Sequence, residues 1–115
     1  MAEKELRWIK LMGINDQLPR EGKIVYTQVE SRKIYICRWE GVLYAGDDQC
    51  PHAGGILSKG YCENKQIVCP LHRWKFDLES GKNTEGEGGY INTYPIKREE
   101  NIYWLGLPQK KWWEF

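Results

Sequence analysis

The chain has 115 residues with 17 basic and 16 acidic side chains, and this balance gives no reason to expect nucleic acid or a membrane surface as a partner. Hydrophobic residues make up 41% of it, which argues against intrinsic disorder and suffices for one core in a single domain over residues 1–115. No segment reaches the roughly 20 apolar residues of a membrane helix, and the N-terminus has no apolar stretch after a basic start, so we expect a soluble, cytoplasmic protein.

Short β-strands separated by turns are the pattern along the chain. In chain order, the predicted strands cover residues 7–12, 23–29, 33–39, 42–47, 66–68, 92–97 and 102–107. The first of these segments also allows a short helix, and Pro95 should confine the strand at 92–97 to the edge of a sheet. No longer window shows helical periodicity. The sequence therefore predicts an all-β fold.

The strand at 33–39 should follow a turn at 30–32 and have two distinct faces, because successive side chains of a strand point to opposite sides. The expected faces are Ile34 and Ile36 on one side and Tyr35, Cys37 and Trp39 on the other. On this pattern Cys37 is expected to be an inert, buried thiol.

Two segments rich in Gly, Pro, Cys and His interrupt the strand pattern. Residues 48–59 and 69–83 are expected to form two ordered loops on either side of the short strand at 66–68, and the glycine-rich stretch 81–89 should form a third loop. Together the first two loops would make a small subdomain at about residues 47–83.

Four side chains in these two loops can bind a metal. Cys50 and His52 lie in the first loop, and Cys69 and His72 lie in the second. Such a set suits either a tetrahedral zinc ion or a [2Fe–2S] cluster in which two His replace two Cys on one iron. Zinc fingers usually pair Cys with Cys and His with His, whereas each loop here carries one of each, so the spacing favours the binuclear cluster. A zinc-binding structural module is the alternative.

The segments CPHAGGILS (50–58) and CPLHRWKFDLESGK (69–82) resemble the two cluster loops of Rieske proteins, and the resemblance extends over about residues 6–107. It implies the Rieske fold, which has an antiparallel β-sandwich or barrel base and a small cluster-binding subdomain formed by two loops, with one [2Fe–2S] cluster per chain. The ligands implied by the resemblance are Cys50 and Cys69 on one iron and His52 and His72 on the other.

The resemblance also separates the branches of the family. Rieske oxygenases need two further His for a non-haem iron, and this chain has two His in total, so it should not be an oxygenase itself. The quinol-oxidising branch has a disulfide at the positions of Gly55 and Leu71, and hydroxyl donors near the cluster at the positions of Trp74 and Phe76. Fewer hydrogen bonds to the cluster predict a midpoint potential below about 0 mV, within a family range of about −150 to +300 mV.

These observations predict a low-potential ferredoxin that carries single electrons from a reductase to a terminal oxygenase or related oxidoreductase. Such a chain is an electron-transfer component rather than an enzyme. The alternative within the family is the small subunit of an NADH nitrite reductase. Arg73 stands where the family usually has Gly, and the two alternatives for it are a cation that shapes the docking surface beside His72 and a side chain that points to water. Cys62 lies between the loops, where a third metal ligand or a redox thiol is an alternative to a structural role.

Overall fold

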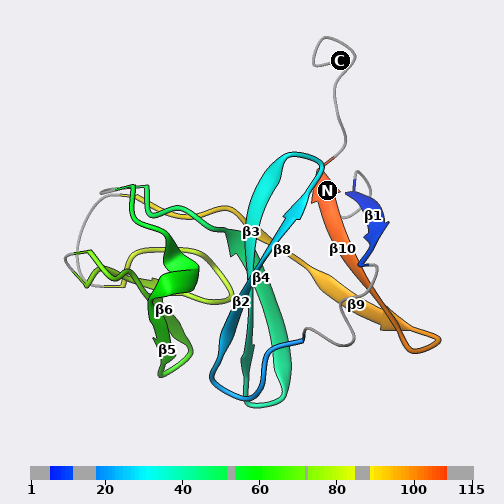
Figure 1. The fold of residues 1–115 in the computed structure, drawn as a ribbon, viewed down its shortest axis with the longest axis horizontal. Helices are drawn as coiled ribbons and strands as arrows, with labels where there is room; N and C mark the ends of the chain where they lie inside the picture. Colours follow the sequence, from blue (N-terminus) through cyan, green and yellow to red (C-terminus); the bar gives the residue numbers. More distant parts are fainter. Residues whose placement is uncertain (1–5, 12–17, 52–53, 72, 85–88, 109–115) are drawn as a thin grey trace, which may run out of the picture.

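The structure, a computed structural model, describes residues 6–11, 18–51, 54–71, 73–84 and 89–108. These residues form ten β-strands and one short 3-10 helix, and no α-helix occurs among them (Figure 1). The strands assemble into three antiparallel sheets. The all-β prediction is therefore confirmed. The described residues contain no helix with the length and hydropathy that crossing a membrane requires.

The strands of the three sheets come from different parts of the chain. The first sheet contains, in order, β1 (Leu6–Lys10), β10 (Ile102–Pro108) and β9 (Ile96–Glu99). The second contains β2 (Ile24–Val29), β3 (Arg32–Trp39), β4 (Val42–Asp47) and β8 (Thr93–Tyr94). The third contains β5 (Tyr61–Glu63), β6 (Gln66–Val68) and β7 (Lys75–Asp77). Residues 48–84, which hold the third sheet, are called the loop region below.

The β2–β3 hairpin shows why the local sequence folds as it does. Val29 pairs with Arg32, so the turn has two residues, Glu30 and Ser31, where the sequence pattern predicted three. Both turn residues have positive φ, 52° and 71°. This conformation matches the right-handed twist of the flanking strands, which is why two-residue turns of this kind are favoured in hairpins.

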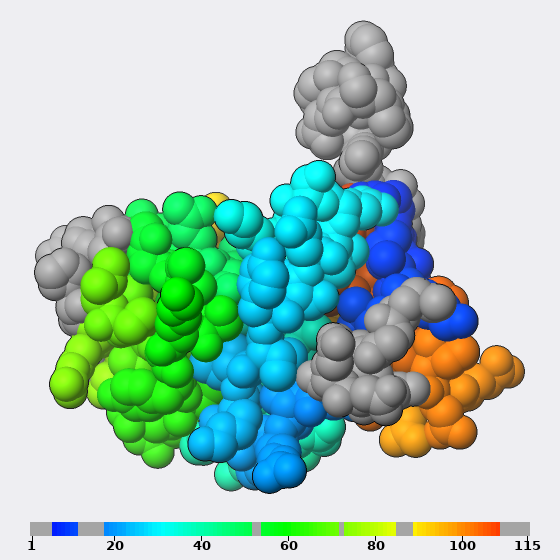
Figure 2. All heavy atoms as spheres, in the orientation of Figure 1, coloured from blue at the N-terminus to red at the C-terminus, as the bar shows by residue number. Residues whose placement is uncertain are grey.

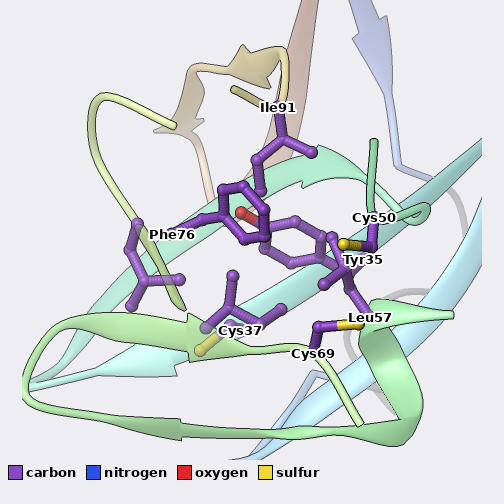
Figure 3. Packing of buried hydrophobic residues seen from close by; sticks show 9 residues of the cluster. Tyr35, Cys37, Cys50, Leu57, Cys69, Phe76 and Ile91 are labelled. Atoms are coloured by element: carbon purple, nitrogen blue, oxygen red, sulfur yellow. The ribbon is translucent and has the colours of Figure 1, made fainter. Parts of the chain in front are cut away.

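The second sheet has a core on each of its faces, and β3 contributes to both. Ile34 and Ile36 pack with Leu105 and Leu107 against the first sheet. Tyr35 and its neighbours on the opposite face pack against the loop region, as Figure 3 shows. The residues of β3 in this second core are Tyr35 and Cys37, with Trp39 packed beside them. The predicted alternation along this strand is confirmed, and the loop region and the first sheet lie on opposite sides of the central strands (Figure 2).

The segment predicted as one strand at 92–97 is two strands in two different sheets. The break falls at Pro95, which lies between β8 and β9. Proline has no N–H to donate to a neighbouring strand, so the strand pairing is interrupted at this residue. The chain leaves one sheet there and enters the next. Both strands are edge strands, as predicted. Gly106 makes this crossing possible, because a Cβ at that position would lie 2.9 Å from the Pro95 side chain.

The loop region holds more regular structure than the sequence predicted. The predicted strand at 66–68 is confirmed as β6. The predicted loop at 69–83 contains β7, the predicted loop at 48–59 contains the 3-10 helix η3 (Leu57–Lys59), and β5 was not predicted. Strands of three residues are too short to show an alternating pattern in the sequence. They form here because each of them pairs with an adjacent strand of the same sheet.

Candidate metal centre

Cys50 and Cys69 meet in the core beneath the loop region. Cys50 lies three residues after β4, and Cys69 directly follows β6. Their exposed fractions are 1% and 0%, and both belong to the core that includes Phe76 and Leu57 (Figure 3). The two thiols lie within hydrogen-bonding reach of each other. Two cysteines that are distant in sequence are thus brought together from opposing loops.

The first loop is closed by its own backbone around Cys50. The N–H of Cys50 donates to the carbonyl of Gly55 over 2.8 Å, and the N–H of Gly54 donates to the carbonyl of Cys50 over 2.8 Å. These paired bonds fix the orientation of the Cys50 side chain, since the backbone on both sides of its Cα is held.

A buried carboxylate anchors the far end of the same loop. Asp48, 4% exposed, accepts hydrogen bonds from the N–H and the hydroxyl of Ser58, each over 2.6 Å. Burial raises the pKa of Asp48, and the two bonds from Ser58 act in the opposite direction. Sequence reasoning missed this anchor. The signal available was a polar pair, Asp48 and Ser58, at the two ends of a loop rich in Gly and apolar residues.

The second loop supplies a donor to the cysteine sulfur. The N–H of Cys69 donates to the carbonyl of Trp74 over 2.8 Å and closes the loop. The N–H of Leu71 points back to Sγ of Cys69 over 3.4 Å. Burial raises the pKa of Cys69, and the Leu71 N–H opposes that shift. A backbone donor aimed at a buried sulfur stabilises negative charge there, as a metal-bound thiolate requires.

Gly55 and Leu71, the positions compared with the disulfide of the quinol-oxidising branch, are neighbours. A Cβ at Gly55 would lie 2.9 Å from Sγ of Cys69 and 3.3 Å from the Leu71 side chain. Glycine is therefore required where the first loop crosses the sulfur of the second. No covalent bond joins the loops at this crossing.

Trp74 and Phe76 contribute apolar surface around the two cysteines. Phe76 is fully buried in the core that contains both cysteines, and Trp74 packs against that core while remaining partly exposed. Phe76 carries no hydroxyl, so it donates no hydrogen bond. Leu71 is 48% exposed and lies at the outer end of the site.

The predicted histidine ligands, His52 and His72, lie outside the described residues. Their described neighbours Pro51, Leu71 and Arg73 are exposed. Within the described ranges, no group of three or more Cys, His, Asp or Glu side chains could hold a metal ion. The two buried sulfurs and the backbone donor fit the thiolate half of a [2Fe–2S] cluster.

An all-β base that brings together two buried cysteines from two opposing loops is typical of proteins that bind an iron–sulfur cluster or a zinc ion. The model of the Rieske [2Fe-2S] domain family matches residues 7–95, which is most of the chain, and the chain belongs to this family. Rieske domains bind a [2Fe–2S] cluster, so the resemblance seen in the sequence is confirmed.

The chain is similar in sequence to ferredoxin components of dioxygenase systems. It is 35% identical over 99 residues to that of the naphthalene 1,2-dioxygenase system of Pseudomonas putida, covering 82% of this chain and 89% of the relative. It is 39% identical over 107 residues to that of the 2,4-dinitrotoluene dioxygenase system of Burkholderia sp. (strain RASC), covering 87% and 95%.

Solved structures share the fold at lower identity. The ferredoxin of carbazole 1,9a-dioxygenase from Nocardioides aromaticivorans IC177 has a TM-score of 0.75 at 23% identity, covering 90% of this chain and 98% of that one. A Mycobacterium tuberculosis chain provisionally described as an NADH-dependent nitrite reductase small subunit has a TM-score of 0.78 at 16% identity, covering 91% and 98%. At these identities the likeness shows the fold alone.

Proposed function

We propose that this protein is a Rieske ferredoxin that carries single electrons through one [2Fe–2S] cluster per chain, from a reductase to a terminal oxygenase or related oxidoreductase. The observation that carries the proposal is the pair of buried sulfurs, Cys50 and Cys69, brought together by loops of a Rieske domain. Relatives that match most of the chain are ferredoxin components of dioxygenase systems, which supports the electron-carrier role over catalysis by the chain itself.

In this proposal the ligands are Cys50 and Cys69 on one iron and His52 and His72 on the other. The cluster supplies a reversible one-electron couple when bound. The chain holds the sulfurs in a dry core lined by Phe76, and the Leu71 N–H stabilises charge on the Cys69 sulfur. Residues 47–83 act as the cluster-binding subdomain of a single domain, and the exposed loop ends provide a short path for electrons to a redox partner.

The nitrite reductase alternative rests on fold likeness. Sequence relatives at 35% to 39% identity favour the dioxygenase ferredoxin role. Co-purification distinguishes the two, because a ferredoxin is isolated alone and a small subunit is isolated with its large partner.

Iron and sulfide analysis with electron paramagnetic resonance of the reduced protein tests the cluster directly. We expect two irons per chain and the lowered average g-value of mixed His and Cys ligation. His72→Ala should remove or strongly alter the visible spectrum, whereas Cys62→Ser, a change outside the ligand set, should leave it intact. A colourless protein with one zinc ion would contradict the proposal.

The absence of hydroxyl donors at Trp74 and Phe76 predicts a midpoint potential below about 0 mV. Phe76→Tyr adds a hydroxyl beside the cysteines and should raise the potential by an amount on the order of tens of millivolts, because a hydrogen bond to the cluster stabilises its more negative, reduced state. Redox titration of both proteins provides the measurement. A wild-type value above about +150 mV would show that the chain belongs to the high-potential part of the family range.

A further inference from the structure

A second pair of thiols belongs to the same core as the two candidate ligand cysteines. Cys37 of β3 is fully buried, and Cys62 of β5 is partly exposed. The two side chains pack together and lie within hydrogen-bonding reach of each other. Their strands belong to different sheets, so this contact joins the central sheet to the loop region.

We propose that Cys37 and Cys62 form a second redox site, a dithiol that closes to a disulfide and covalently links the central sheet to the loop region. Neither residue is among the ligands of the proposed cluster, so this site goes beyond the electron-carrier role. Two thiols that face the same core within hydrogen-bonding reach of each other are placed to form an S–S bond, which sets this pair apart from a single buried cysteine.

The two cysteines have different roles in the reaction. Cys62 lies on β5, an edge strand of its sheet, and is partly exposed, so we expect it to be the thiol that a small disulfide such as oxidised glutathione meets first. Cys37 is shielded, and its hydrogen bond with Cys62, together with burial, raises its pKa and keeps it a thiol. Cys62 is therefore the attacking residue and Cys37 the resolving residue.

The steps balance with oxidised glutathione as the oxidant. The Cys62 thiolate attacks one sulfur of the glutathione disulfide, and the departing glutathione thiolate takes up a proton. Cys37 then loses its proton and attacks the Cys62 sulfur of the mixed disulfide, which releases the second glutathione as a thiol. In total, two protein thiols are oxidised and one glutathione disulfide is reduced to two glutathiones.

The bond would close a loop from Cys37 to Cys62 that includes Cys50 and the anchored segment up to Ser58. Restraining this loop should slow any opening that exposes the ligand cysteines. We therefore expect the oxidised protein to lose its cluster to a chelator several-fold more slowly than the reduced protein, and dithiothreitol to reverse the effect.

The competing reaction is oxidation of the ligand pair, since Cys50 and Cys69 are also in contact. Trypsin resolves the two reactions, because cleavage after Lys33, Arg38, Lys59, Lys65 and Arg73 puts each of the four cysteines on its own peptide. The peptides are 34–38 with Cys37, 39–59 with Cys50, 60–65 with Cys62 and 66–73 with Cys69.

The experiment incubates the holoprotein with oxidised glutathione, alkylates remaining thiols and maps the digest by mass spectrometry without reduction. The expected result is peptide 34–38 linked to peptide 60–65, with the visible spectrum of the cluster unchanged. Peptide 39–59 linked to 66–73 with loss of the spectrum, a lasting glutathione on 60–65, or alkylation of both Cys37 and Cys62 would each overturn the proposal.

Two variants test the assigned roles. In Cys37→Ala the resolving thiol is absent, so one glutathione should remain on peptide 60–65. Cys62→Ser, at a partly exposed position, should take up no glutathione on peptide 34–38 and should keep its cluster. A glutathione on peptide 34–38 of Cys62→Ser would show that Cys37 is directly accessible and would overturn the order of attack.

Discussion

The central sheet and the loop region are held together in different ways. The central sheet has long strands, with eight residues in β3 and six each in β2 and β4, and apolar side chains cover both of its faces. The loop region has three-residue strands, and its loops are held by individual hydrogen bonds such as those between Asp48 and Ser58. Both regions bury apolar side chains, and we expect the loop region to depend in addition on these polar contacts and on the proposed cluster.

The largest expected effect follows from removing the proposed cluster. For amides of β5 and β6, the opening free energy measured by hydrogen exchange should fall by at least about 2 kcal/mol more than for amides of β3. The reason is that binding of the cluster stabilises the segment that carries its ligands. Exchange measured by mass spectrometry on cluster-loaded and chelator-treated protein gives the comparison. Equal losses in both regions would show that the two unfold as one unit.

Asp48 tests the polar contacts without changing a ligand. Asp48→Ala removes both acceptors for Ser58 and should lower the opening free energy of the Ser58 amide by about 2 kcal/mol, because hydrogen bonds to a charged group are being lost. Asp48→Asn keeps one acceptor and should cost about 1 kcal/mol. Exchange of the Ser58 amide and the rate of iron release to a chelator report the effect. Identical behaviour of the two variants would count against the anchor.

Two tyrosines on the central sheet should respond with opposite signs. Among the described residues, the buried Tyr35 hydroxyl has no hydrogen-bond partner, whereas that of Tyr94 donates to Asp47 over 2.6 Å and accepts from Arg32 over 3.1 Å. Tyr35→Phe should raise the free energy of unfolding by about 1 kcal/mol, and Tyr94→Phe should lower it by about 1 kcal/mol. Denaturant unfolding at neutral pH measures both. Destabilisation by Tyr35→Phe would reveal a partner for that hydroxyl.

Tyr94 also predicts a pH dependence. Burial, followed by the hydrogen bond to Asp47, raises the pKa of Tyr94 to about 12 from a usual value of 10.0. The folded state then holds this proton more tightly, so the stabilisation is complete below pH about 10 and is lost as pH rises toward about 12. Tyr94→Phe should remove this component of the alkaline loss, which unfolding measured across that window will show.

The smallest expected effect concerns Arg73, whose φ is 58°. The other described residues with a side chain and positive φ all lie in two-residue hairpin turns: Glu30, Ser31, Glu40, Asn64, Lys65, Glu100 and Asn101. Arg73 instead lies in the second loop of the candidate metal centre. Arg73→Gly should stabilise the protein by about 0.5–1 kcal/mol, because glycine adopts this conformation without the steric cost. Arg73→Ala is the control and should bring no such gain, since alanine keeps the cost. Thermal unfolding of the three proteins measures the difference.

Particular residues show how far the sequence could predict the structure. The sequence predicted that Ile34 and Ile36 lie on one face of β3 and that Tyr35 and Cys37 lie on the other, because the side chains of a strand alternate with a period of two residues. The break at Pro95 could be predicted only in part from the sequence. Proline predicted an edge, but the change of sheet depends on the close approach of Gly106, which comes from a strand further along the chain.

The sequence by itself determined the candidate donor residues, their spacing along the chain and the all-β character, because these are properties of short segments. Only the tertiary structure decided that Asp48 reaches Ser58, that the Leu71 N–H points at the Cys69 sulfur, and which cysteines meet. The four cysteines form two pairs, and each pair joins residues from different strands or loops. Such distances are set by how sheets pack on one another, and packing depends on contacts between segments that local sequence patterns do not contain.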